Sequence, residues 1–116
     1  MREPEMFEPM VKYLREQEYA ILQVNKGKRT GPDIIAERAG RKLVIQMKGD
    51  SAAITTDWYT GLGQLLNNMD DKDADYAMAV SESYKRLVEA FPSYVKNKLK
   101  LTFFIVNDDG SVKSVD

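Results

Sequence analysis

The chain lacks cysteine and histidine altogether among its 116 residues. Disulfide frameworks, thiolate zinc sites, cysteine nucleophiles and every mechanism that uses a histidine base are therefore excluded. It also has no run of about 18 apolar residues, and residues 1–9 are too charged to form the apolar centre of a signal peptide. We therefore expect a soluble, cytoplasmic protein whose chemistry depends on carboxylates, lysines, hydroxyls or hard metal ions.

The composition predicts one domain spanning residues 1–116. A hydrophobic content of 43% is enough for one core in a chain of this length, which is too short for two conventional domains. The net charge is only -1, but residues 23–48 are strongly basic whereas aspartates gather in residues 70–75. Because salt confines attraction to about 10 Å, a local basic stretch can attract a phosphate backbone even in a slightly acidic protein.

The hydrophobic pattern predicts helices that alternate with strands. Strands separated by helices in the second half require crossover connections, so we expect an α/β fold with a mixed central sheet flanked by helices. The predicted order is α-β-β-β-α-β-α-β. The expected helices are 5–17, a second running from Thr56 or Asp57 to Met69, and 82–91, and the expected strands are 19–24, 32–37, 42–47, 76–80 and 99–106.

Three polar residues are associated with the two neighbouring strands 32–37 and 42–47. Asp33 follows Pro32, which keeps the chain extended and fixes the carboxylate at the start of its strand. Gln46 and Lys48 are two residues apart, so strand alternation points them to the same face. Burying an amide and an ammonium in an apolar strand costs several kcal/mol unless they are paired. The arrangement predicts a divalent-metal site with Asp33 and Gln46 as ligands and Mg²⁺ or Mn²⁺ as the ion.

These residues resemble a known motif. Gly31-Pro32-Asp33 followed by Gln46-x-Lys48, in this order of elements, resembles the PD-(D/E)xK nuclease superfamily, which includes restriction endonucleases, archaeal Holliday-junction resolvases and RecB-type nuclease domains. The segment 51–64, which ends in Gly61-x-Gly63-Gln64, is similar to the segment after the lysine in the XisH-like branch of this superfamily. The resemblance covers nearly the whole chain and implies a restriction-endonuclease-like core.

The resemblance also implies roles for individual residues. Asp33 would bind the metal, Lys48 would position or polarise the attacking water, and Gln64 would support the site. Family members often add an acidic residue from the first helix, and Glu3, Glu5 and the less well-oriented Glu8 are the alternatives here. Where this chain has Gln46 the family usually has Asp or Glu. Because an amide oxygen is a neutral, weaker Mg²⁺ ligand, we expect loose metal binding unless a helix glutamate or the phosphate adds charge.

The leading hypothesis is a metal-dependent endonuclease-like protein that hydrolyses DNA. Lys26, Lys28 and Arg29 would hold the DNA backbone, and the small size together with the resemblance predicts a homodimer. The alternative is a catalytically attenuated module that binds nucleic acid or regulates a partner. A third reading is a structural partner of another nuclease subunit. Duplex, branched, single-stranded and RNA targets share the same phosphates, so the sequence does not separate them.

Overall fold

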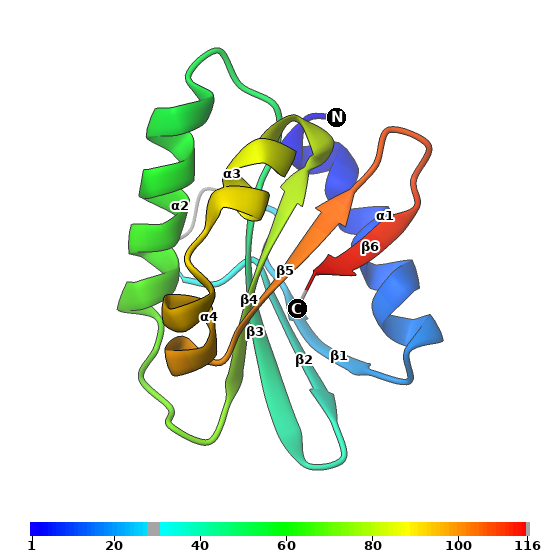
Figure 1. Cartoon of the computed structure of the whole chain (residues 1–116). Coiled ribbons are helices and arrows are strands. Elements are labelled where there is room, and N and C mark those ends of the chain that lie inside the picture. The colour runs from blue at the N-terminus through cyan, green and yellow to red at the C-terminus, as the bar shows by residue number, and fades with distance from the viewer. Residues whose placement is uncertain (28–30, 116) are drawn as a thin grey trace.

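The computed structural model, which describes residues 1–27 and 31–115, contains one six-stranded sheet with helices on both faces (Figure 1). Its first half comprises α1 (Glu3–Glu16), β1 (Ala20–Val24), β2 (Ile34–Arg38), β3 (Arg41–Lys48) and α2 (Ile54–Asn67). Its second half comprises β4 (Asp75–Ser81), the 3-10 turn η1 (Glu82–Tyr84), α3 (Lys85–Ala90), α4 (Ser93–Leu99), β5 (Leu101–Val106) and β6 (Val112–Val115).

The strands lie in the sheet in the same order as in the sequence. The pairs β1–β2, β2–β3 and β5–β6 are antiparallel, whereas β3–β4 and β4–β5 are parallel. Parallel neighbours need crossover connections, and α2 and the η1–α3–α4 segment supply the two that this sheet requires. The centre of the sheet is therefore β3 and β4, each of which has a run of at least five consecutive buried residues.

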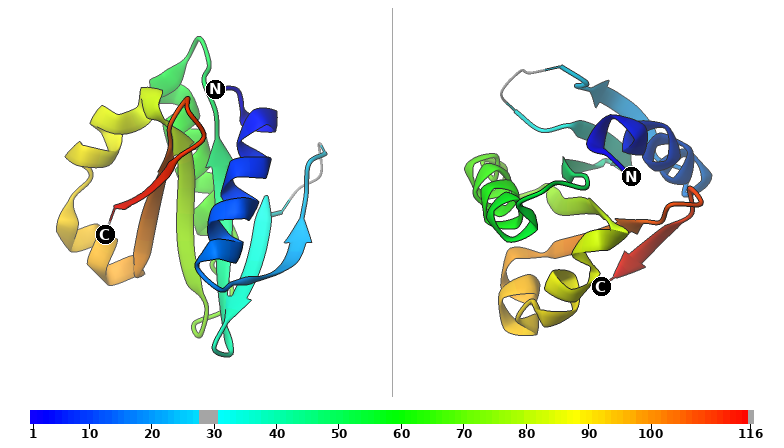
Figure 2. Two further views of the ribbon diagram at one scale, coloured as in Figure 1. Left: turned by 90° about the vertical axis from the view of Figure 1, so that its right-hand side faces the viewer. Right: turned by 90° about the horizontal axis from the view of Figure 1, so that it is seen from above.

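Strand alternation separates the core into two clusters. Ile45 and Met47 of β3 pack with α1 on one face, whereas Val44 packs with the cluster formed by α2, α3 and α4 on the other. The view from above in Figure 2 shows α1 on one side of the sheet and α2 on the other. Gln46 and Lys48 share the face of Val44, so the predicted polar pair lies on the same side as α2.

The predicted mixed α/β fold, with a central sheet flanked by helices, is confirmed. The second predicted helix begins earlier than expected, at Ile54, and its N-cap Ala53 makes no side-chain capping bond. Two elements were not predicted, namely α4 and β6. Pro92 follows the end of α3 and also occupies the N-cap position of α4. β6 is an edge strand of four residues with only two apolar side chains. Lys100 adopts a left-handed conformation that ends α4, so β5 starts at Leu101 rather than at residue 99.

Among the residues that the structure describes, no helix has the length and apolar character that crossing a bilayer requires.

Candidate active site

Asp33 is fixed immediately before β2. Its backbone N–H donates to the Ile45 carbonyl at 3.0 Å, and its carboxylate Oδ2 accepts the Met47 backbone N–H at 2.7 Å. The residue is 9% exposed. Burial raises the pKa of the Asp33 carboxyl, and the Met47 hydrogen bond and the Lys48 charge offset part of that rise. The sequence therefore holds an anionic oxygen in a site that disfavours its charge, as is typical of functional carboxylates.

Gln46 lies against this carboxylate. Its Nε2 donates to Asp33 Oδ2 at 2.9 Å and to Gln64 Oε1 at 3.3 Å, which joins β3 to α2. The residue is 6% exposed, and its Oε1 is buried without a hydrogen-bond partner among the described residues. Such orphaned oxygens are rare because leaving one unpaired costs about 1–3 kcal/mol. Gln46 thus has an unpaired carbonyl oxygen, a potential metal ligand, beside an aspartate.

Lys48 ends β3 two residues farther along and is half-buried. Its aliphatic stem lies against α2 at Gly61, where an added Cβ would stand 2.9 Å from Lys48 Cγ and 2.5 Å from Met78 Cε. A larger residue at 61 would displace the lysine. The Lys48 charge lowers the pKa of both Asp33 and Glu3, so the ammonium acts on both carboxylates electrostatically.

Glu3 is the helix glutamate that the structure brings to this site. Burial raises its pKa, repulsion from Asp33 raises it further, Lys48 lowers it and Asp57 raises it. Glu5 instead pairs with Arg2 at 3.1 Å on the exposed surface. Its carboxylate is therefore engaged away from Asp33, and Glu8 is also exposed.

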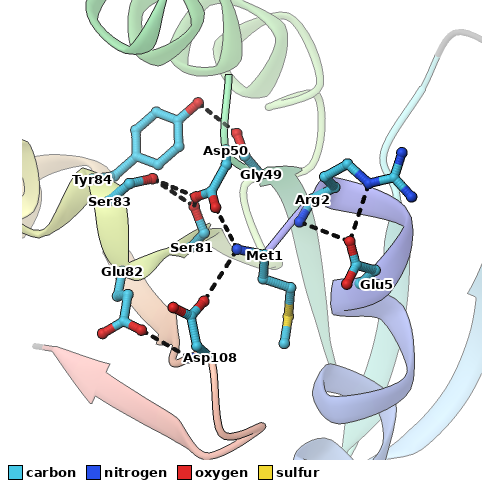
Figure 3. A network of polar contacts seen from close by, with 10 residues as sticks. All are labelled: Met1, Arg2, Glu5, Gly49, Asp50, Ser81, Glu82, Ser83, Tyr84 and Asp108. Carbon is cyan, nitrogen blue, oxygen red and sulfur yellow. Dashed lines mark hydrogen bonds and ion pairs between the residues drawn. The ribbon is translucent and has the colours of Figure 1, made fainter. Parts of the chain in front are cut away.

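A polar network anchors Met1 at the start of the chain, and sequence reasoning missed it (Figure 3). The Met1 ammonium contacts the carboxylates of Asp50 and Asp108, and the Asp50 N–H donates to the Met1 carbonyl at 2.9 Å. A Cβ at Gly49 would stand 2.1 Å from the Glu3 backbone nitrogen, so only glycine permits this close approach. The signal was the Gly49-Asp50 pair directly after Lys48.

Asp50 is the centre of this network. Its Oδ1 accepts hydrogen bonds from the hydroxyls of Ser81, the last residue of β4, at 2.5 Å and of Ser83 in η1 at 2.6 Å. Together with the Met1 ammonium, which is the largest cause, these bonds lower the pKa of Asp50 to about 2. The Tyr84 hydroxyl donates to the neighbouring Gly49 carbonyl at 2.9 Å. The loop after Lys48 is therefore held at both the sheet and the start of α1.

The predicted nucleic-acid contacts are only partly within the described residues. Lys26 is exposed after the end of β1. Lys28 and Arg29 lie outside the described residues.

The oxygen set around Asp33 fits a hard divalent ion. Asp33, the neighbouring Glu3 and the unpaired Oε1 of Gln46 are the ligand types that Mg²⁺ uses, and Mg²⁺ commonly takes only one or two protein carboxylates. In the parts of the chain that the structure describes, no three carboxylates gather closely enough to hold a metal by themselves. The Gln46 amide donates to Asp33, so an ion between the two residues requires this amide to turn its Oε1 toward the carboxylate.

Comparison with known proteins identifies the fold. No family model matches the chain, and no curated protein matches it. Two solved structures are similar over nearly their whole length. An XisH family protein from Nostoc punctiforme PCC 73102 has a TM-score of 0.64 and 19% identity, covering 96% of this chain and 99% of the other. An fdxN element excision controlling factor protein from Anabaena variabilis has a TM-score of 0.63 and 21% identity, covering 97% and 99%. The chain therefore has the fold of the XisH family proteins.

Proposed function

We propose that this domain hydrolyses DNA phosphodiester bonds with a divalent metal bound at Asp33 and Gln46. One observation carries the proposal: side chains from four segments of the chain interact with one another beside β3, namely Glu3 of α1, Asp33 before β2, Gln46 and Lys48 of β3, and Gln64 of α2. The group combines hard oxygens with one ammonium, which is the donor set that phosphodiester hydrolysis needs. The fold shared with XisH family proteins supports a nuclease-like or regulatory module.

Each residue has a distinct task in this mechanism. A divalent ion held by Asp33 and Gln46 would supply Lewis-acid stabilisation of charge developing on the phosphate. Asp33 provides the anionic ligand, and its attachment to the Met47 N–H keeps it oriented. Gln64 steadies the Gln46 amide from α2. Lys48 presents a positive charge beside the carboxylates, where its ammonium can hold a phosphate oxygen or the attacking water.

Basic residues that precede Asp33 in the sequence would bind the DNA backbone. Lys26, Lys28 and Arg29 follow β1 in the sequence, and the segment that contains them leads directly to Asp33. Cations that bind phosphates release counterions, so DNA affinity should fall as salt rises. An affinity that is independent of salt would instead favour a protein partner for these basic residues.

A second candidate function has its own support. The Gln46 amide already donates to Asp33, so this carboxylate has a hydrogen-bonded partner without any metal. Such a site suits a module that binds nucleic acid or regulates a partner without cleaving. Gln46→Glu distinguishes the two candidates. A rise in cleavage identifies the natural protein as an attenuated relative, whereas a fall identifies Gln46 as an adapted ligand.

The test of the proposal is cleavage of plasmid, branched and single-stranded DNA by the purified protein with Mg²⁺, Mn²⁺ or chelator. Cleavage should require the metal and should be lost in Asp33→Ala and Lys48→Ala. Gln23→Ala, a change at an exposed position of β1, is the control and should cleave like the wild type. DNA binding without cleavage under every metal would replace the proposal with the non-catalytic module.

A further inference from the structure

A hollow of about 640 Å³ lies at the end of the sheet opposite to the candidate active site. Its walls come mainly from the C-terminal part of α1, the beginnings of β3, β4 and β5, and the end of α4. Leu43, near the start of β3, lines this hollow, whereas Lys48 ends the same strand about 16 Å farther along. Figure 1 shows α4 and the hairpin between β2 and β3 at the lower end of the sheet, and the N-terminus at the upper end. The size of the hollow suits a small molecule, since such sites have about 300–1,000 Å³.

Three cationic side chains line the hollow, namely Arg38, Lys96 and Lys100. None of them forms an ion pair with a carboxylate in the part of the chain that the structure describes. Asp75, the one carboxylate among the described lining residues, is bound through both oxygens to Arg41, at N–O distances of 2.8 and 3.2 Å. Positive charge therefore exceeds negative charge around the hollow, although the whole chain has a net charge of -1. Such a hollow attracts an anion.

Lys100 stands where glycine is the usual residue. It directly follows α4 and has φ 52° and ψ 47°, which is the left-handed conformation. Helices often end in this conformation, usually at glycine, because a Cβ is strained there. Strained residues of this kind persist where the surrounding structure holds them, and they cluster at ligand sites. A lysine at such a position in a cationic hollow therefore indicates that its ammonium group has a use.

Arg38 is held in position from two sides. Its Cζ lies 4.2 Å from the centroid of the Tyr19 ring, and its Nη1 donates to the Gln17 carbonyl at 2.8 Å. Because an arginine has five N–H donors, this one bond leaves others for a ligand. The rings of Tyr13 and Phe104, which pack edge to face with centroids 5.6 Å apart, add an aromatic wall to the same hollow. The hollow thus combines positive charge with aromatic surface.

We propose that this hollow binds a nucleotide, with the phosphate held by Lys96 and Lys100 and the base stacked beside Arg38. Ammonium groups donate charge-assisted hydrogen bonds to phosphate oxygens, and planar bases stack on guanidinium groups and aromatic rings. A simple anion would use the charge but leave the aromatic wall uncovered. A free nucleotide and a nucleotide within a nucleic-acid strand share this chemistry, and binding measurements separate the two sources. The hollow lies away from Asp33, so nucleotide binding here does not depend on a metal ion or on cleavage.

Titration calorimetry of the full chain with the four common ribonucleoside monophosphates, in chelator so that no metal is bound, tests the site. At least one of them should bind at one site per chain. It should bind more tightly than its nucleoside or inorganic phosphate, because only the nucleotide meets both the cations and the aromatic wall. Failure of all four to bind at their highest soluble concentrations would overturn the proposal, as would inorganic phosphate that binds as tightly as the nucleotides.

Lys100→Gly separates binding from folding. Glycine relieves the left-handed strain after α4, so the melting temperature should be at least that of the wild type. Loss of the ammonium group should raise the nucleotide dissociation constant about tenfold or more. Lys98→Ala removes the same charge from α4 at a residue that does not line the hollow and whose ammonium lies over the Tyr94 ring, so it should bind nucleotide like the wild type. Wild-type affinity in Lys100→Gly would overturn the proposal.

A 5′-phosphorylated single-stranded oligonucleotide, titrated in chelator, identifies the source of the nucleotide. If Lys100→Gly weakens binding of both the strand and the mononucleotides, nucleotides of a strand enter the hollow. If it weakens only mononucleotide binding, the ligand is a free nucleotide. Asp33→Ala should keep the nucleotide affinity of the wild type, so that failure of the proposed cleavage and failure of this site are distinguishable. A nucleotide affinity that is lost in Asp33→Ala would overturn a separate site.

Discussion

Replacing Gln46 with glutamate should make the stability of the fold depend on Mg²⁺ and on pH. The Gln46 Nε2 lies 2.9 Å from Asp33 Oδ2, and the two residues are 6% and 9% exposed. Gln46→Glu exchanges this hydrogen-bond donor for a second carboxylate oxygen. Two unit charges at that separation repel by about 6 kcal/mol at an effective dielectric constant of about 20.

Protonation limits the loss of stability. A glutamate has a reference pKa of about 4.3, so keeping it protonated at pH 7.5 costs about 4 kcal/mol. This value is lower than the repulsion and therefore sets the expected destabilisation at about 4 kcal/mol in chelator. The folded-state pKa is raised, so the deficit should disappear as the pH falls to about 4. Mg²⁺ between the carboxylates should restore stability at neutral pH.

Urea unfolding of the wild type and Gln46→Glu, in chelator and in Mg²⁺ at several pH values, measures these effects. Gln23→Glu makes the same change at an exposed position of β1 and should alter stability by less than about 0.5 kcal/mol. If Gln46→Glu is as stable as the wild type in chelator at pH 7.5, the two side chains do not face each other as described here.

Three further outcomes follow from the site. Asp33→Asn should abolish metal-dependent cleavage yet be at least as stable as the wild type at pH 8, because burial raises the Asp33 pKa above its ordinary 3.8 and ionisation opposes folding. In urea unfolding, the stability of Asp33→Asn relative to the wild type should increase from pH 4 to pH 8, and a variant less stable than the wild type at pH 8 would contradict this. Glu3→Gln should weaken Mn²⁺ binding in calorimetry while Glu5→Gln does not, because only Glu3 is coupled to Asp33; equal effects would refute this assignment. Asp50→Asn should lower the free energy of unfolding at pH 7, as measured by urea unfolding. The difference from the wild type should shrink as the pH falls from 3.8 to about 2, because Asp50 loses the charge that holds Met1 over this range. A difference that does not change with pH would count against the ion pair.

Most of the fold could be predicted because its elements have strong local signals. The apolar run of β3 and the helical spacing in α1 bury large side chains, and both elements appear where expected. The edge strand β6 has little apolar content, and the proline before α4 signals both an end and a beginning. Where the local preference is this weak, packing against the rest of the fold determines the structure, so sequence patterns alone do not predict β6 or α4.

The site could be predicted only where strand geometry connects its residues. Alternation places Gln46 and Lys48 on one face, and pairing of β2 with β3 brings Asp33 to them. The choice of Glu3 over Glu5 depends on a contact between the chain start and Gly49, which are far apart in sequence. No periodic pattern encodes such a contact.

Mn²⁺ binding to the purified protein and to Asp33→Asn, measured by calorimetry and electron paramagnetic resonance in the absence of DNA, tests the proposed metal centre directly. One weak site per chain should be found in the wild type, and it should disappear in Asp33→Asn and tighten in Gln46→Glu. Binding that is unchanged in Asp33→Asn, or absent from the wild type at saturating Mn²⁺, would contradict a metal centre at Asp33 and Gln46.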